Sequence, residues 1–542
     1  MDFKDKVVYQ IYIKSFQDTD GDGIGDLKGI TKRLPQLKDL GVDIVWITPF
    51  FKSPQYDNGY DVADYKSIDP LFGDFDDFDE MMKIAKSLGI EIMLDMVFNH
   101  TSTEHEWFQK ALNGDKKYQD YYIFKESNDG APTNWLSKFG GSAWEYVEDL
   151  DKWYLHLFHV KQADLNWDNP DLRREIYEVV DFWKSKGVSG FRLDVVNLIS
   201  KPEIFEDDYE GDGRRFYTDG PNVHKYLKEL AFEGGFSELI TVGEMSSTSI
   251  DNCILYSNPD EKELSMVFNF HHLKVDYKDG QKWVLDEVRW DELFGLFDEW
   301  QTAMQEHDGW SAWFFNNHDQ PRAISRFTDD INYHYESATL IATLTHMMRG
   351  TPYIYQGEEI GTSNPRFKTI EEYIDVESQN YYNILLDEGK TPEEALHIIS
   401  ERSRDDGRTP VAWEENSLYH GFSTVKPWIG FGKISNFYDR DLNSKKSIYK
   451  YYQELIKLRK NHKSISHGKY KKVDSVYQTY AFERVYDDES ALVMLNFTGD
   501  KMDLEISEEI VKKYNEGEIL INNYDDFDIK ELKPYQGVVI SK

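Results

Sequence analysis

The first third of the chain alternates short apolar runs with longer segments in which apolar residues recur every three or four positions. Residues 7–13, 43–49 and 90–97 are apolar runs of strand length, and residues 27–40 and 75–88 have the helical period. A glycine follows each helical segment, as is common where a helix ends. Strands and helices that alternate through short connections predict parallel βα units.

The alternation is interrupted once and then resumes. Residues 101–167 hold five tryptophans among Asn, Gly and Asp, which predicts a loop-rich inserted domain. A helix at residues 171–186 and a strand at residues 188–196 follow the insertion. Further strands are expected at residues 239–243, 265–270, 311–316 and 351–355, which brings the count to eight. Eight βα units predict an α/β fold with a closed (β/α)8 TIM barrel.

The predicted domains follow from these patterns. The barrel takes residues 1–100 and 168–463, with a helical insertion at about 370–402 after the eighth strand and a last barrel helix at residues 447–461. Residues 101–167 form the inserted B domain after the third strand. From residue 464 the chain changes to short alternating strands, which predicts a C-terminal antiparallel β-sandwich domain over residues 464–542.

Charge and composition restrict the possible partners. The net charge of −37 argues against nucleic acid and against anionic membrane surfaces. Cys253 is the only cysteine, so no intrachain disulfide can form, which fits a reducing compartment. The first 16 residues lack the apolar stretch of a signal peptide, and no run reaches transmembrane length. We therefore expect a soluble, cytoplasmic protein that acts as a monomer.

The strand at residues 188–196 contains two opposite charges. Arg192 and Asp194 are two positions apart, so they lie on the same face of a strand. An isolated Arg-x-Asp pair is most simply a structural ion pair. The alternative is an aspartate that arginine keeps ionised so that it can act as a nucleophile.

Polar side chains at the ends of the other strands favour chemistry. In (β/α)8 barrels the active site lies at the carboxyl ends of the strands. Acids, imidazoles and amides follow most of the predicted strands, so we expect them to converge on one pocket. They are Asp95, Asn99 and His100, then Asn197, Glu244, His271 and His272, and finally His318, Asp319, Gln356, Glu358 and Glu359.

A pocket built around carboxylates suggests hydrolysis of a glycosidic bond. Asp194, Glu244 and Asp319 occur without a cysteine, a Ser/His/Asp arrangement or a glycine-rich phosphate loop. Glycoside cleavage needs one ionised and one protonated carboxyl group on either side of the bond. Arg192 favours the anion at Asp194, and the apolar run before Glu244 favours its protonated form. Asp194 is therefore the better nucleophile and Glu244 the better acid/base.

An aspartate-rich loop near the N-terminus is a candidate metal site. Asp18, Asp20, Asp22 and Asp26 alternate with small residues, as the early ligands of a calcium loop do. Gly29 stands where an EF-hand has its last glutamate, so the loop is not an EF-hand. A glycine-rich turn with aspartate caps is the alternative, and we favour the metal.

Four segments resemble the conserved regions of the α-amylase family of glycoside hydrolases: residues 95–100, 190–194, 242–244 and 317–319, in that order. The resemblance covers the whole chain. It implies a barrel, an inserted B domain, a C-terminal β sandwich and retention through a covalent glycosyl intermediate. It also implies that Asp194 is the nucleophile, Glu244 the acid/base and Asp319 the stabiliser of the transition state.

The same resemblance implies the residues that bind the first sugar. These are His100, Arg192 and His318, together with Asp57 and Tyr60 in the segment 56–61 and Arg404, which would pair with Asp57 and close the pocket. The family's usual segment here is R-D-N-x-R-T-P, and Asp406 departs from it. For calcium, the resemblance adds the carbonyl of Ile24 to the four aspartates.

Two further segments indicate a branch. Residues 162–166 resemble the signature of the oligo-1,6-glucosidases and their relatives, and Val195 is typical of members that prefer linkages other than α-1,4. Residues 139–144, 211–214, 243–248 and 269–277 resemble the members that hydrolyse trehalose 6-phosphate.

The segment after the sixth strand supports this branch. Oligo-1,6-glucosidases typically have E-H-M-D here, whereas this chain has His271-His272-Leu273-Lys274, followed by Lys278 and Lys282. A substrate phosphate needs local cations in an acidic protein, although a single lysine is more often a solvated surface residue. The expected reaction is cleavage of α,α-trehalose 6-phosphate to glucose and glucose 6-phosphate, with His271, Lys274 and Lys282 on the phosphate side.

Two alternatives stay open at this point. One is an oligo-1,6-glucosidase or dextran glucosidase that releases glucose from α-1,6-linked oligosaccharides. The other is a non-catalytic sugar-binding or transporter-associated protein. Relatives of that second kind lose catalytic carboxylates, whereas this chain keeps all three.

Overall fold

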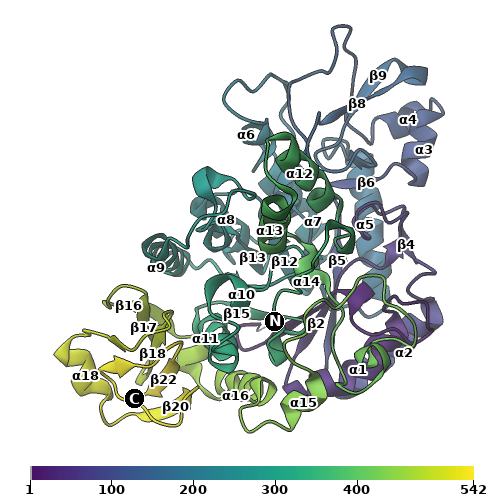
Figure 1. Cartoon of the computed structure of the whole chain (residues 1–542). Helices are drawn as coiled ribbons and strands as arrows, with labels where there is room; N and C mark the ends of the chain where they lie inside the picture. Colours follow the sequence, from purple (N-terminus) through teal and green to yellow (C-terminus); the bar gives the residue numbers. More distant parts are fainter. Residues whose placement is uncertain (1–2) are drawn as a thin grey trace.

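The computed structural model describes residues 3–542, and a closed barrel of parallel strands lies at its centre (Figure 1). The eight strands are arranged in the order β13-β12-β11-β5-β2-β1-β15-β14, and a parallel bridge between Val267 and Ser311 joins the two ends. The predicted (β/α)8 barrel is thus confirmed. The strands are β1 (Val8–Ile11), β2 (Ile44–Ile47), β5 (Glu91–Met96), β11 (Gly190–Leu193), β12 (Ile240–Glu244), β13 (Met266–Phe268), β14 (Ala312–Trp313) and β15 (Thr351–Tyr355).

The barrel helices begin and end where the local sequence dictates. Asp26 and Asp74 cap the first two helices with their side chains, and Gly41 and Gly89 end them in the left-handed conformation. Both helices have the predicted bounds. The main helices around the barrel are α1 (Leu27–Leu40), α2 (Phe75–Leu88), α5 (Pro170–Ser185), α7 (Val223–Phe232), α8 (Ile250–Ser257), α9 (Trp290–Glu306), α11 (His334–Met347) and α16 (Ile448–Asn461).

Several strands are shorter than their apolar runs. The strand predicted at residues 188–196 ends at Leu193, and Val195 has a left-handed φ of 36°. A β-branched residue with positive φ is strained, and such strain clusters at functional sites. The backbone N–H of Asp194 still donates to the Met96 carbonyl at 2.9 Å, which fixes the turn at the end of the strand.

The inserted segment, residues 101–167, which we call domain B, lies above the barrel in Figure 1. It contains more regular structure than the predicted loops. Trp135 and Trp144 are buried in a small core that domain B shares with Val195, Leu198 and Tyr217 of the barrel. A short pair of strands, β6 (His100–Ser102) and β10 (Gln162–Asp164), joins it to the barrel. Its other elements are α3 (Glu106–Leu112), α4 (Lys116–Gln119), and a three-stranded sheet of β7 (Phe124–Lys125), β9 (Lys152–Leu155) and β8 (Trp144–Val147).

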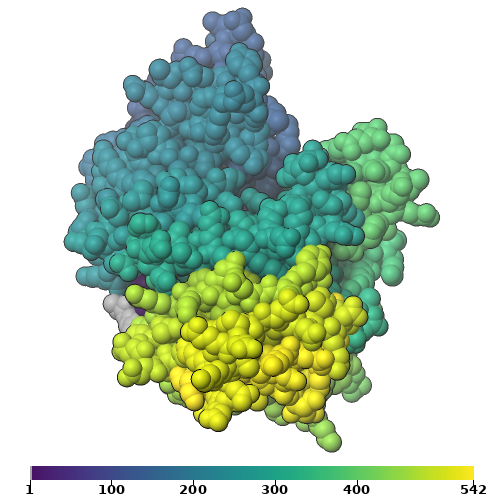
Figure 2. Space-filling model, turned by 90° about the vertical axis from the view of Figure 1, so that its left-hand side faces the viewer, coloured from purple at the N-terminus to yellow at the C-terminus, as the bar shows by residue number. Residues whose placement is uncertain are grey.

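The helical insertion stands opposite domain B. It consists of α12 (Val376–Asp387) and α13 (Pro392–Arg402) and is followed by the short α14 (Asp405–Arg408). Figure 2 shows the molecule hollowed between the blue lobe that includes domain B and the green lobe of this insertion. Among residues 3–542, no helix is both long and apolar enough to cross a membrane.

The C-terminal part is the predicted antiparallel β domain, which is yellow in Figure 1. Its five-stranded sheet covers a core that includes Leu492, Met494 and Val538. The helix α18 (Glu508–Tyr514) was not predicted. The strands are β16 (Lys469–Val473), β17 (Thr479–Tyr486), β18 (Glu489–Asn496), β22 (Gly537–Ser541) and β20 (Glu518–Asn522), beside a second sheet of β19 (Met502–Asp503) and β21 (Glu531–Leu532).

Candidate active site

Arg192 lies at the centre of a group of three carboxyl groups. Its side chain is 2% exposed, and Nη1 donates to Oδ1 of Asp95 and to Oδ1 of Asp194, each at 2.7 Å. Nη2 donates to Oε2 of Glu244. The parallel register produces this arrangement, because Arg192 on β11 pairs with Asp95 on β5 and with Val242 on β12. The Arg192–Asp194 ion pair is therefore part of the predicted pocket of acids.

These three carboxyl groups share a single guanidinium. Desolvation raises the pKa of Asp194 well above its usual value, Arg192 lowers it, and the charges of Glu244 and Asp95 raise it again. Desolvation likewise raises the pKa of Asp95 to about 6, against the effect of Arg192. The effect of Arg192 on Asp194 that the sequence predicts is therefore present, and burial opposes it. Cleavage of a glycoside needs one ionised and one protonated carboxyl group at such a site.

Asp319 has the opposite electrostatic environment. Burial raises its pKa, but His318, Arg404 and Arg408 together lower it by more, to well below the usual range. Nη2 of Arg408 donates to Oδ1 of Asp319 at 2.7 Å, and Nη1 of Arg404 lies 3.5 Å from the same oxygen. Asp319 is therefore ionised at neutral pH.

Aromatic rings and amides form the closed end of the pocket. The ring of Tyr60 is parallel to that of His318, with centroids 5.1 Å apart, and the Tyr60 hydroxyl donates to Oδ2 of Asp95 at 2.9 Å. Nε2 of Gln162 donates to Oδ2 of Asp57 at 3.1 Å. The structure brings all the residues predicted for the first sugar into this region: Asp57, Tyr60, His100, Arg192, His318 and Arg404.

The predicted pair of Arg404 with Asp57 is present but is not the arginine's main contact. Nη2 of Arg404 lies 3.6 Å from Oδ1 of Asp57, whereas its Nε donates to Oδ1 of Asp375 at 3.1 Å. Asp375 is 3% exposed and caps α12, and Asp405 accepts its backbone N–H at 2.8 Å. Sequence reasoning missed Asp375 and Arg408. Arg408 belongs to the predicted R-D-x-x-R-T-P segment, but no spacing in the sequence ties Asp375 to that segment.

A cavity of about 230 Å³ lies on the leaving-group side of the carboxylates. Domain B contributes Phe139, and the helical insertion contributes Glu377. Glu244, Asp319, Lys274, Lys282 and Arg404 also line it.

The three predicted phosphate contacts differ in their surroundings. Lys274 is exposed and has no ion-pair partner among residues 3–542. Nζ of Lys282 donates to Oε2 of Glu377 at 2.7 Å. His271 does not line the cavity. Its ring packs on Trp300 of α9 with centroids 5.0 Å apart, so the structure does not bring His271 together with the two lysines, and its role at the phosphate stays a prediction.

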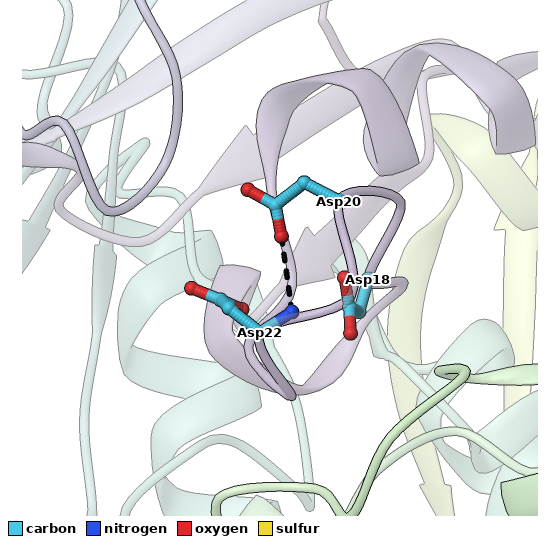
Figure 3. A group of neighbouring side chains, drawn as sticks. All are labelled: Asp18, Asp20 and Asp22. Atoms are coloured by element: carbon cyan, nitrogen blue, oxygen red, sulfur yellow. Dashed lines mark hydrogen bonds between the residues drawn. The ribbon is translucent and has the colours of Figure 1, made fainter.

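The aspartate-rich loop gathers three of its four acids. One carboxylate oxygen from each of Asp18, Asp20 and Asp22 lies within 4.8 Å of the others (Figure 3). Desolvation raises the pKa of Asp22, and the charges of Asp20 and Asp18 raise it further. Three converging carboxylates fit a hard cation such as Ca²⁺. Asp26 lies outside this group, because its carboxylate accepts the N–H of Thr19 at 2.7 Å and of Gly29 at 2.6 Å as the cap of α1.

Comparisons with known proteins agree with this geometry. The family profile described as alpha amylase, catalytic domain, matches residues 10–468. The chain is 46% identical to a trehalose-6-phosphate hydrolase of Bacillus subtilis (strain 168), over 99% of this chain and 97% of the relative. It is 43% identical to an oligo-1,6-glucosidase of Bacillus cereus, over 99% of this chain and 98% of the relative. The crystal structure of Bacillus licheniformis trehalose-6-phosphate hydrolase is similar with a TM-score of 0.94 and 47% identity, over 99% of both chains. With three carboxylates at the strand ends of its barrel, this chain belongs to the alpha-amylase family and is a glycosidase.

Proposed function

We propose that this protein hydrolyses α,α-trehalose 6-phosphate to glucose and glucose 6-phosphate. The observation that supports this most directly is Lys274, an unpaired cation in the cavity next to Glu244 and Asp319. A phosphate dianion needs such cations in a chain with a net charge of −37. The similarity to trehalose-6-phosphate hydrolases over nearly the full length supports the same substrate.

The geometry suggests a double displacement. The unmodified glucose occupies the closed end between Tyr60 and Arg404, and the phosphorylated glucose occupies the cavity. The Asp194 carboxylate attacks the anomeric carbon while the Glu244 carboxyl gives its proton to the glycosidic oxygen, which releases glucose 6-phosphate. Glu244 then takes a proton from water, the water oxygen attacks the glycosyl–Asp194 ester, and glucose leaves with retained configuration. Asp319 stays ionised and offsets the positive charge that develops on the sugar ring.

The test is a comparison of initial rates. Purified enzyme should cleave trehalose 6-phosphate faster than isomaltose, with equal amounts of glucose and glucose 6-phosphate as products. Faster cleavage of isomaltose would favour the alternative function, that of an oligo-1,6-glucosidase, which the similarity to the Bacillus cereus oligo-1,6-glucosidase supports. Asp194→Asn should lose turnover on both substrates. Turnover that survives in that variant would contradict the catalytic assignment.

The phosphate assignment has its own variant. Lys274→Ala should weaken binding of trehalose 6-phosphate far more than binding of an unphosphorylated analogue. Equal losses on the two substrates would contradict a phosphate role for this lysine.

We also propose that the loop of Asp18, Asp20 and Asp22 binds one structural Ca²⁺, with Asp26 and the carbonyl of Ile24 as the further expected ligands. Bound metal stabilises the native state by mass action, by about 3 kcal/mol at a hundred times its dissociation constant. Chelation should therefore lower the thermal midpoint, and added Ca²⁺ should restore it. An unchanged midpoint would support the capped turn instead.

The cellular setting is part of the proposal. We propose a monomer that acts in the cytoplasm, because the single cysteine, Cys253, is buried and no disulfide is needed for this fold. Light scattering should give a mass near 63.8 kDa. A mass of twice that value would contradict the monomer.

A further inference from the structure

Lys138 belongs to domain B and approaches the leaving-group cavity from a different part of the chain than Lys274 does. Its Nζ donates to Oγ of Ser246 at 3.3 Å, and Ser246 lines the cavity together with Phe139, the residue after Lys138. Among residues 3–542 no carboxylate lies within ion-pair distance of Lys138. No sequence pattern had indicated this residue.

Several cations gather at this point of an otherwise acidic protein. The pKa of Lys138 is lowered to about 8, mainly by desolvation and also by the charges of Arg214 and Lys274, against Asp212 and Glu244. Desolvation and Arg214 also lower the pKa of Lys274. Arg214 is bound to Asp212, with Nη2 donating to Oδ2 at 2.6 Å. Lys138 and Lys274 are therefore left as two neighbouring cations that repel each other, and a bound dianion would relieve this repulsion.

Lys282, unlike Lys138 and Lys274, has a carboxylate partner. It lines the same cavity, but its Nζ is bound to Glu377 at 2.7 Å, and the two side chains are only 22% and 12% exposed. A phosphate could use Lys282 only by displacing or joining an existing carboxylate. Oε2 of Glu377 also lies 3.6 Å from Nε of Arg404, so this one carboxylate faces two cations.

The hydroxyl of Ser246 is held in place by the backbone around it. The N–H of Ser246 donates to Oδ1 of Asn197 at 2.9 Å, and Nδ2 of Asn197 donates to the Ser246 carbonyl at 2.9 Å. Asn197 is fully buried at the end of the same strand turn as Asp194. The position of this hydroxyl, two residues after Glu244, is therefore fixed before substrate binds.

We propose that Lys138 and Lys274, with the Ser246 hydroxyl, form the phosphate site of the cavity, and that Lys138 is a specificity-determining residue contributed by domain B. This inference rests on the proposed hydrolysis of trehalose 6-phosphate. Domain B then acts in substrate choice as well as in covering the pocket.

The test compares kcat/KM on trehalose 6-phosphate and on 4-nitrophenyl α-glucopyranoside, which has no phosphate. Lys138→Ala should raise KM for trehalose 6-phosphate by about tenfold or more, with a much smaller change on the chromogenic substrate. Lys138→Arg should keep most of the preference, because the cation is retained. Lys161→Ala, an exposed lysine of the same domain, is the matched control.

Equal losses on both substrates in Lys138→Ala would overturn the inference. If Lys138→Ala unfolds, Lys138→Gln serves in its place, and inhibition by glucose 6-phosphate gives a second measurement. The inhibition constant of glucose 6-phosphate should rise in the variant, and an unchanged constant would contradict the site. A wild type that prefers isomaltose overturns the proposed function itself. A wild type that prefers trehalose 6-phosphate with an unchanged ratio in Lys138→Ala overturns only this inference.

Discussion

Asp406 is a buried acid without partners, and replacing it with asparagine should stabilise the protein. It is 0% exposed within α14, and neither carboxyl oxygen has a hydrogen-bond partner among residues 3–542. Desolvation raises its pKa well above the usual value, and the charges of Glu401 and Asp405 raise it further. Arg322 and Arg366 oppose this shift without reversing it. The folded protein therefore holds a neutral carboxylic acid here, where the family segment usually has asparagine.

The size of the effect follows from the difference between the folded and unfolded pKa values. An aspartate in the unfolded chain has a pKa of about 3.9, and each pH unit above that value favours unfolding by about 1.4 kcal/mol while the folded group stays neutral. The folded pKa is raised, so the penalty is absent at acidic pH and grows as the pH rises toward the folded pKa. Asparagine cannot ionise, and as a neutral polar group of the same shape it differs little from the protonated acid. The advantage of Asp406→Asn should thus grow as the pH rises, by at most about 3 kcal/mol between pH 5 and pH 7.

Thermal unfolding of the two proteins at one scan rate measures this difference. For a chain of 542 residues, one kcal/mol corresponds to a midpoint change of about 1 °C. The gap between Asp406→Asn and wild type should therefore widen from pH 5 to pH 7, by at most about 3 °C. Glu388→Gln, an exposed acid on the same insertion, is the control. A gap that stays constant, or that closes as the pH rises, would refute the reasoning, because it would mean that Arg322 or Arg366 keeps Asp406 ionised.

Three further predictions concern the site. Asp375→Asn removes the carboxylate that holds Arg404, so the free energy of unfolding should fall by about 3–5 kcal/mol. The value of kcat/KM should fall by similar factors on phosphorylated and unphosphorylated substrates. A change in the ratio of the two kcat/KM values would contradict this prediction. Burial raises the pKa of Asp57 to about 7, although Arg404 and Arg408 lower it, so kcat/KM should rise as the pH increases through about 7. Asp57→Asn should lose this rise in the pH profile. If the rise persists in the variant, it belongs to the titration of another group. Glu244→Gln should lower kcat on trehalose 6-phosphate by about 10²–10⁴-fold and should cost less on 4-nitrophenyl α-glucopyranoside, whose leaving group needs no proton; equal losses would argue against the acid role.

Most of the fold could be predicted from the sequence, because different sequence patterns indicated the same helices and strands. Apolar runs, helical periods and capping residues such as Asp26 and Gly41 indicated the same elements, so the helices at residues 27–40 and 75–88 have their predicted bounds. The strand at residues 188–196 was too long, because periodicity cannot show that the chain turns at Asp194 to open the site. Domain B was predicted as loops, since its short strands lack a clear period.

The site was predicted where residues follow strands and was missed where they come from insertions. Asp194, Glu244 and Asp319 stand at barrel strand ends, so the fold places them together. Asp375 and Lys138 reach the pocket only through tertiary packing, which no local pattern encodes. The direction of the His271 ring could not be predicted either, because the side-chain direction of a turn residue depends on the helix it meets, here at Trp300. The electrostatics of Asp194 also needed the structure, since only it shows that one arginine serves three carboxyl groups.

The most direct test of the central claim is a competition between substrates. Wild-type enzyme is given equal concentrations of trehalose 6-phosphate and isomaltose in one vessel, and the decrease of each is followed over time, which yields the ratio of the two kcat/KM values. We predict that trehalose 6-phosphate is consumed faster by about tenfold or more, because only it contacts the unpaired cations of the cavity. Equal consumption, or faster loss of isomaltose, would contradict the account.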